Sequence, residues 1–339
     1  MAPRPPIRRA SARPRWIKRL RFDPLPALVS SGDPAIRHAA ARDLLGENPG
    51  PAAELWNLPR VQALLRKQKS DGSWPYPGGG VPRYRDFEDY AQIETYRILG
   101  VLVEKFAATR RLRAVGQAAE FMFTRQNAAG DFRGIYGRQY TPNYTGGILE
   151  LLVKAGYGGD PRVRRAFTWL LSIRQHDGGW AIPMLTRRGR WDQPSLSKPA
   201  LAPDLAKPAS HMVTGVVLRA FAAHPRYRRS AAARQAARLL AGRLFSRDKY
   251  PGRDAASFWV GFGFPFWFTD LLSALDSLTL IGVSPGDLKV AEALDWFIRA
   301  QRRDGTWRLH ATRGSDPNTE LWISLAICRV FRRMGDADG

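Results

Sequence analysis

Carboxylates crowd into one short stretch of the chain, Asp86-Phe87-Glu88-Asp89. Like charges held together in a dry site resist joint ionisation, so one carboxyl of such a cluster can stay protonated at neutral pH. A structural interpretation competes with this one. Asp and Glu are also favoured at helix starts, where they cap the first turn and complement the helix dipole.

Further side chains able to bind a ligand or carry a charge lie where other helices are predicted to begin. Cap residues and apolar runs predict helices that start near residues 86, 143, 211, 265 and 318. Their first turns carry a second set of candidates: Tyr90, Glu94, Asn143, Tyr144, His211, Thr214, Trp267, Asp270, Asn318, Glu320 and Trp322. Capping alone accounts for Asp, Asn and Glu at helix starts, so both interpretations stay open for each residue.

A repeated turn sets the positions of these helices. Each time, a predicted helix ends in Gln, and a short turn leads to Gly and then to Trp or Phe. The four copies run from Gln68 to Trp74, Gln126 to Phe132, Gln175 to Trp180 and Gln301 to Trp307. A repeat of about 50 residues holds two helices and their connections. The next copy after Gln175 begins only at Gln301, which is about twice the repeat length. This spacing predicts a degenerate copy in between, with its helix at 231–244 and its turn at 247–252.

Each part of the turn has a physical role. Gly can adopt the left-handed backbone that ends a helix, and the Gln amide can bond backbone groups left free at a neighbouring helix end. The aromatic ring then buries a large apolar surface. We expect no strands, and the continuous repeats favour one domain at 33–335, with 44% hydrophobic residues to form its core.

These turns resemble the QW repeats of squalene and terpene cyclases and of the related protein prenyltransferases. The resemblance covers residues 33–335 and implies an all-α fold, the α/α toroid, in which inner helices surround a central cavity and outer helices surround them. Inner helices of a toroid run the same way. Their first turns, with the candidate residues named above, would therefore meet at one mouth of the cavity.

The acidic cluster is similar to the Asp-x-Asp-Asp motif of class II terpene cyclases, with Glu88 in the third place. The resemblance implies that Glu88 protonates an alkene or epoxide and that Asp86 and Asp89 support it. Glu is one methylene longer than Asp, so the acidic proton of Glu88 would lie at a different position from that of the Asp in the motif. We expect no metal and no cofactor, because Cys328 is the only cysteine and lies in an apolar run. A cysteine-free metal set of Asp270, His211 and Glu320 stays open.

The chain is strongly basic, with a formal net charge of +23. Residues 1–21 alone hold eight Arg and Lys residues, with Trp16 and no acidic residue. We predict a flexible basic tail at 1–32. Its segment 1–21 either contacts an anionic membrane surface or has no partner, and both interpretations stay open. No fold signature favours nucleic-acid binding. Without an apolar run of about 18 residues or an apolar signal-peptide core, we expect a cytoplasmic protein that can attach to a membrane peripherally.

Three functions stay open. The first is an enzyme that binds an isoprenoid in a central apolar cavity and cyclises it, with the aromatic run 258–268 to stabilise carbocations or fill the core. The second is a non-catalytic toroid that binds a lipid or a protein partner. The third is a polysaccharide lyase-like toroid with Asn143, Tyr144 and His211 exposed in an open cleft.

Overall fold

The computed structural model describes residues 14–77, 89–311 and 316–336, and these ranges contain helices and loops but no β-strand. Helices begin where the sequence supplies a cap. Asp33 accepts a hydrogen bond from the backbone N–H of Ala35, and Pro34 occupies the first helical position. The all-α prediction is confirmed for the described part of the chain.

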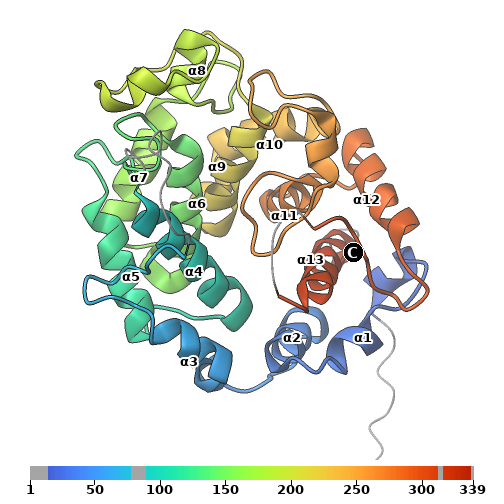
Figure 1. Cartoon of the computed structure of the whole chain (residues 1–339). Coiled ribbons are helices and arrows are strands. Elements are labelled where there is room, and N and C mark those ends of the chain that lie inside the picture. The colour runs from blue at the N-terminus through green and yellow to red at the C-terminus, as the bar shows by residue number, and fades with distance from the viewer. Residues whose placement is uncertain (1–13, 78–88, 312–315, 337–339) are drawn as a thin grey trace, which may run out of the picture.

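Six of the described helices form a closed inner ring around the centre of the molecule (Figure 1). In chain order they are α2 (Pro34–Ala40), α4 (Tyr90–Phe106), α6 (Pro142–Leu152), α9 (His211–Ala223), α11 (Leu271–Ile281) and α13 (Thr319–Asp336). Each contacts the next, and α13 returns to α2. The predicted α/α toroid is therefore confirmed.

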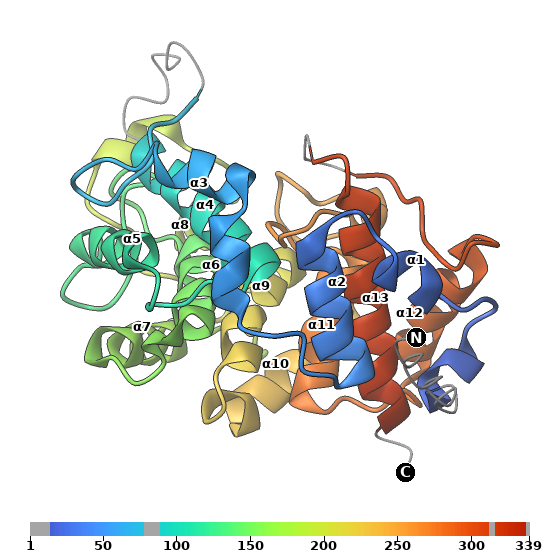
Figure 2. The ribbon, with the colours of Figure 1, turned by 90° about the horizontal axis from the view of Figure 1, so that it is seen from below.

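A second set of helices covers the outside of this ring, as the two views in Figures 1 and 2 show. They are α1 (Leu25–Val29), α3 (Pro59–Leu65), α5 (Arg113–Thr124), α7 (Pro161–Ser172), α10 (Ala231–Gly242) and α12 (Leu288–Ala300). Short helices occupy the connections: η1 (Arg15–Arg19), η2 (Ala41–Leu45), η3 (Ala52–Asn57), η5 (Val153–Tyr157), α8 (Pro183–Arg188), η6 (Gln193–Ser197), η7 (Tyr227–Arg229) and η8 (Ala256–Val260). None of the described helices is long and apolar enough to cross a membrane.

The Gln turns join each repeat to the next. Gln68 Nε2 donates to the carbonyl of Gly72 in its own turn at 2.9 Å and to that of Ala114 in the first turn of α5 at 2.8 Å. Gln126 Nε2 bridges its own turn and the carbonyl of Arg162, in the first turn of α7, in the same way. Gln175 instead donates to two carbonyls of the long loop that precedes α9. Each of these amides thus satisfies two backbone acceptors at once, and those of Gln68 and Gln126 join two segments by doing so.

The last turn closes the ring. Gln301 Nε2 donates to the carbonyls of Phe22 at 2.9 Å and Gly305 at 3.0 Å, and its Oε1 accepts from the N–H of Phe22 at 3.0 Å. Gly305 has φ +82°, and a Cβ there would lie 2.2 Å from the carbonyl oxygen of Asp23. Only glycine permits this approach, so the final repeat holds the segment just before α1.

The aromatic residue of each turn ties an outer helix to an inner one. Trp74, Trp180 and Trp307 donate from Nε1 to a carbonyl at the end of the preceding outer helix, at 2.6–2.8 Å. Their backbone N–H groups donate to hydroxyls of the inner helices, on Thr95, Thr214 and Ser324. Thr214, predicted as a site residue, thus has a structural role.

The degenerate repeat is present with a changed turn. Its outer helix, α10, follows the prediction closely. The indole of Trp259 takes the place of the repeat tryptophan and donates from Nε1 to the carbonyl of Ser246 at 2.8 Å. The next inner helix begins at Leu271 rather than near Pro265, so residues 261–270 form an irregular segment. That segment enters the centre of the ring.

The described part of the predicted tail is ordered by packing. Residues 14–32 contain η1 and α1, and η1 lies against α13. Trp16 and Ile17 are buried there. Residues 1–13 lie outside the described residues, so the predicted contact of segment 1–21 with an anionic membrane stays a prediction.

We expect Gln301→Leu to lower the free energy of unfolding by about 2–3 kcal/mol. It removes two hydrogen bonds with Phe22 that close the ring and one with Gly305 in its own turn. Urea denaturation measures the change. Arg302→Leu in the same turn is the control, since Arg302 is exposed and such substitutions usually cost less than about 0.5 kcal/mol. Equal effects of the two substitutions would contradict the closure role.

Candidate functional site

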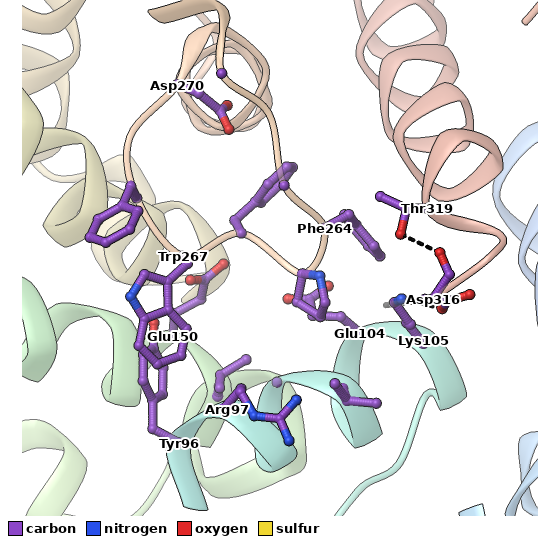
Figure 3. Close-up of a pocket in the computed structure, with 18 residues that line it drawn as sticks. Tyr96, Arg97, Glu104, Lys105, Glu150, Phe264, Trp267, Asp270, Asp316 and Thr319 are labelled. Carbon is purple, nitrogen blue, oxygen red and sulfur yellow. Dashed lines mark hydrogen bonds and ion pairs between the residues drawn. The ribbon is translucent and has the colours of Figure 1, made fainter. Parts of the chain in front are cut away.

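A cavity of about 450 Å³ lies at the centre of the toroid, between α4, α6, the segment 261–270 and the start of α13 (Figure 3). One wall is aromatic and consists of Tyr96, Phe264, Phe266, Trp267 and Phe268. The rings of Tyr96 and Trp267 lie 4.6 Å apart, centroid to centroid. Such a volume and such a wall are typical of small-molecule sites.

A buried ion pair holds this wall in place. Arg219 of α9 is 2% exposed and donates from Nε to Glu150 Oε2 of α6 at 2.8 Å. Its two other nitrogens donate to the carbonyls of Phe268 at 3.3 Å and Phe266 at 3.4 Å. A buried guanidinium is costly unless paired and hydrogen-bonded, and these partners meet that need. The irregular segment is thereby attached to two inner helices.

The ion pair continues into a short chain of charges. Lys154 of η5 donates to Glu150 at 2.7 Å and to Glu104 of α4 at 2.5 Å. Burial opposes ionisation of Glu150, but Lys154 and Arg219 outweigh it and hold the pKa of Glu150 below its usual range. Glu150 therefore stays ionised and serves as an anchor rather than a proton donor.

Asp270 has a different environment on the same cavity. It caps α11, accepting from the backbone N–H of Ser273 at 2.7 Å, and it is 4% exposed. Burial raises the pKa of Asp270 to about 6, because the bonds from Ser273 and the charge of Arg219 only partly offset the desolvation of the carboxylate. Of the carboxyls that line the cavity, it is the one described with a raised pKa.

The remaining charged groups of the lining are paired. Arg97 and Glu94 form an ion pair at 2.6 Å, and Lys105 pairs with Asp316 at 2.5 Å. Burial lowers the pKa of Lys105, against the opposing pull of Asp316. The cavity is therefore aromatic on one side and ionic on the other. The aromatic side fits the predicted apolar cavity, and the paired charges are an addition that the sequence did not predict.

The structure brings several predicted site residues to this cavity or just behind it. Trp267 and Asp270 line it directly. Glu94 reaches it through Arg97, and Tyr144 packs edge-on against Trp267 with centroids 6.2 Å apart. Trp322 stacks on Phe264 from behind, 5.5 Å away and nearly parallel.

Other predicted residues lie elsewhere. His211 is buried beside Trp259, and its Nε2 lies 3.6 Å from Asp248. Burial lowers the pKa of His211, so it is neutral at pH 7. Asn143 donates to the hydroxyl of Tyr136 at 3.1 Å, and Glu320 pairs with Arg308 at 3.2 Å.

The open cysteine-free metal set finds no support in these positions. Asp270 lines the central cavity, whereas His211 and Glu320 do not. Within the described ranges, no group of three or more His, Cys, Asp or Glu residues is arranged to hold a metal ion.

The acidic cluster is described only at its end. Asp86 and Glu88 lie outside the described residues, so the role predicted for them stays a prediction. Asp89 accepts from the backbone N–H of Gln92 at the start of α4 and pairs with Arg125 Nε at 2.7 Å. Tyr90 packs edge-on against Tyr76. Asp89 thus serves as a helix cap and is absent from the lining of the central cavity.

Sequence reasoning missed eight polar residues of the site: Tyr96, Arg97, Glu104, Lys105, Glu150, Arg219, Asp316 and Thr319. A usable signal was present for two of them. Glu150 and Arg219 are single charges inside otherwise apolar stretches of their helices. A charge in such a place is buried and needs a partner.

Comparison with known proteins gives one sequence match and several structural ones. No family model matches the chain. Over 95 residues, 28% of this chain, it is 33% identical to a protein named "Probable squalene–hopene cyclase" from Sinorhizobium fredii, strain NBRC 101917 / NGR234. The aligned stretch spans 14% of that relative.

Two solved structures illustrate the structural matches. Ligand-free type II terpene cyclase MstE from Scytonema matches with a TM-score of 0.38 and 14% identity, over 84% of this chain and 99% of that one. A family 88 glycosyl hydrolase from Bacteroides vulgatus matches with a TM-score of 0.42 and 14% identity, over 84% and 89%. Both TM-scores are below 0.5.

We expect Asp270→Asn to change how stability depends on pH. The pKa of Asp270 is about 6 in the fold against 3.8 for an unperturbed carboxyl. The native state therefore binds the extra proton between these values, and this group's contribution to stability falls as pH rises through them. Asn still caps the helix. Urea unfolding across about pH 4 to 6 should show wild type losing stability relative to the variant.

Asp160→Asn is the matched control. Asp160 also caps a helix, but its hydrogen bond to Arg162 lowers the pKa of Asp160. Its stabilising contribution is therefore present above the unfolded pKa and is lost as pH falls, which is the opposite sign. A pH-independent difference between wild type and Asp270→Asn would contradict the environment described for Asp270.

Proposed function

We propose that the central cavity binds a neutral, isoprenoid-type ligand against its aromatic wall. The observation that carries this proposal is the wall itself, five aromatic residues around a cavity of about 450 Å³. Binding an apolar chain against this wall removes the apolar surfaces of both from water, which lowers the free energy. The local sequence similarity to a protein named as a squalene–hopene cyclase supports the same ligand class.

The charges of the cavity favour this ligand over an acidic sugar. Four of the lining residues are acidic, Glu104, Glu150, Asp270 and Asp316, and two are basic, Arg97 and Lys105. The high positive charge of the chain is therefore not concentrated here. His211, which a lyase-like cleft would expose, is 1% exposed. Both features weigh against the lyase-like alternative.

A proton transfer by Asp270 would turn binding into catalysis. In this step the O–H bond of protonated Asp270 breaks and the proton joins one alkene carbon, using the electron pair of the double bond. The other carbon becomes a carbocation, and the rings of Tyr96 and Trp267, which line the same cavity, would stabilise its positive charge. Loss of a proton from a neighbouring carbon to Asp270 then restores the acid, so the net reaction is an isomerisation or cyclisation.

We expect Trp267→Ala to weaken binding of geranylgeraniol about tenfold or more, because a large ring of the wall is lost. Isothermal titration calorimetry measures the dissociation constant. Trp191→Ala is the control, since Trp191 packs on Tyr136 and is absent from the cavity lining. Absence of binding to the wild type, or equal weakening by both substitutions, would show that the cavity does not bind such a chain.

We expect Asp270→Asn to keep the affinity for the isoprenoid and to abolish its conversion. Conversion by the wild type should fall as pH rises above about 6, since the pKa of Asp270 is about 6 and the acid must be protonated. Product analysis by gas chromatography and mass spectrometry provides the measurement. Glu88→Gln is assayed alongside. Loss of conversion in Glu88→Gln alone would assign the acid to Glu88 instead, and loss in neither variant would leave binding as the function.

A further inference from the structure

A second cavity, of about 630 Å³, lies toward the opposite ends of the inner helices. In α4 the central cavity is lined from Tyr96 to Lys105, whereas the second is lined by Val103 and Glu104 near the C-terminal end of the helix. In α13 the lining moves from Thr319 to the stretch 326–333. The two cavities share Phe264, Phe266 and Glu104, so the irregular segment 261–270 separates them.

The lining of the second cavity is basic. Four arginines, Arg42, Arg329, Arg332 and Arg333, face two aspartates, Asp43 and Asp276. Lys154 and Glu104 complete the charged residues described there, and they pair with each other. The two mouths of the toroid therefore differ in charge, with an acidic excess at the aromatic cavity and a basic excess here.

One aspartate, Asp43, binds three of these arginines, two through its carboxylate and one through its main-chain carbonyl. Asp43 accepts from Arg42 Nε at 2.6 Å and from Arg329 Nε at 2.8 Å, and Arg332 donates to its main-chain carbonyl. Burial disfavours the ionised form of Asp43, but Arg42 and Arg329 outweigh it and hold the pKa of Asp43 below its usual range. A single negative charge is divided between two guanidinium groups.

The hydrogen bonds that join these arginines to the rest of the protein use only some of their N–H groups. Arg329 joins α13 to η2 through Asp43, and Arg333 joins α13 to α11 through Asp276 and Thr279. These bonds use the Nε and Nη2 edges. The Nη1 groups of Arg42, Arg329 and Arg333 donate no hydrogen bond to any described residue and are not among the buried, unpartnered atoms. Three residues that line one cavity, Arg42, Arg329 and Arg333, thus each keep an Nη1 group that donates to no described residue.

We propose that this second cavity binds a phosphate-type anion, a ligand outside the function proposed for the central cavity. Arginine is the preferred partner of phosphate oxygens, because its N–H groups form directed, charge-assisted hydrogen bonds. Free carbonyls at the helix ends carry partial negative charge at this mouth, and the bond from Arg332 to the Asp43 carbonyl satisfies one of them. The Nη1 groups that donate to no described residue supply the hydrogen bonds and positive charge for the anion.

The anion can be a free ion or the head group of an amphiphile. The two cavities share Phe264 and Phe266, so a chain in the central cavity could carry a phosphate into the second one. The chemistry that recognises the anion is the same in both cases. Inorganic pyrophosphate is therefore the primary probe, because it has no chain and its binding does not depend on the aromatic wall.

The test is calorimetric titration of the full chain with pyrophosphate at low ionic strength, where attraction is least screened. We expect saturable binding that Arg42→Gln weakens about tenfold, which corresponds to about 1.4 kcal/mol. Arg329 still holds Asp43 in this variant, so the tie to α13 is retained. Arg308→Gln is the control, because it removes the same charge from an exposed residue outside this cavity. We expect it to leave the affinity unchanged.

Two results would overturn the proposal: no saturable binding, or equal weakening by Arg42→Gln and Arg308→Gln, which would indicate general attraction to a basic protein. Geranylgeranyl diphosphate then distinguishes the sources. If it binds more tightly than pyrophosphate, and Trp267→Ala removes only that gain, the site serves an amphiphile. If it binds no more tightly, the site serves a free anion. Either result supports the anion site, whether or not the central cavity binds isoprenoids.

Discussion

The helical ring is closed by hydrogen bonds between Gln side-chain amides and backbone groups, and the rest of the structure depends on this closure. In three of the four copies, the Gln amide bonds a carbonyl of its own turn and a backbone group in the segment at or just before the start of another outer helix. A helical repeat cannot bury its apolar face alone and needs a neighbour on each side. The bonds between Gln301 and Phe22 supply that neighbour to the first and last repeats, so the ring has no free end.

A closed ring of six helices leaves a centre that helix side chains alone do not fill. The irregular segment 261–270 occupies part of it, and the buried contacts of Arg219 with Glu150 and two carbonyls of the segment hold it there. This segment divides the centre into two cavities of unlike chemistry. One presents aromatic rings and carboxyls, and the other presents arginines. A single buried guanidinium thus sets the shape of both candidate sites.

Periodicity explains which features could be predicted. The Gln turns repeat, so the helix starts near 143, 211 and 318 and the degenerate outer helix at 231–244 were placed within a few residues. Of the predicted site residues, Trp267 and Asp270 line the central cavity, and their role there stays a prediction. His211 does not line this cavity, because a position in the first turn of an inner helix does not determine whether its side chain faces the cavity or a neighbouring loop.

By itself the sequence determined the helical repeats, since Gln, Gly and the aromatic residue act over short distances that recur with the repeat. The toroid was implied by the resemblance of these turns to QW repeats. Only the tertiary structure decided the chemistry at the centre. Arg219 and Glu150 lie 69 residues apart, and Lys105 and Asp316 lie 211 apart. No local pattern joins such residues. Their pairing, and the raised pKa of Asp270, arise from burial, which exists only once the ring has closed.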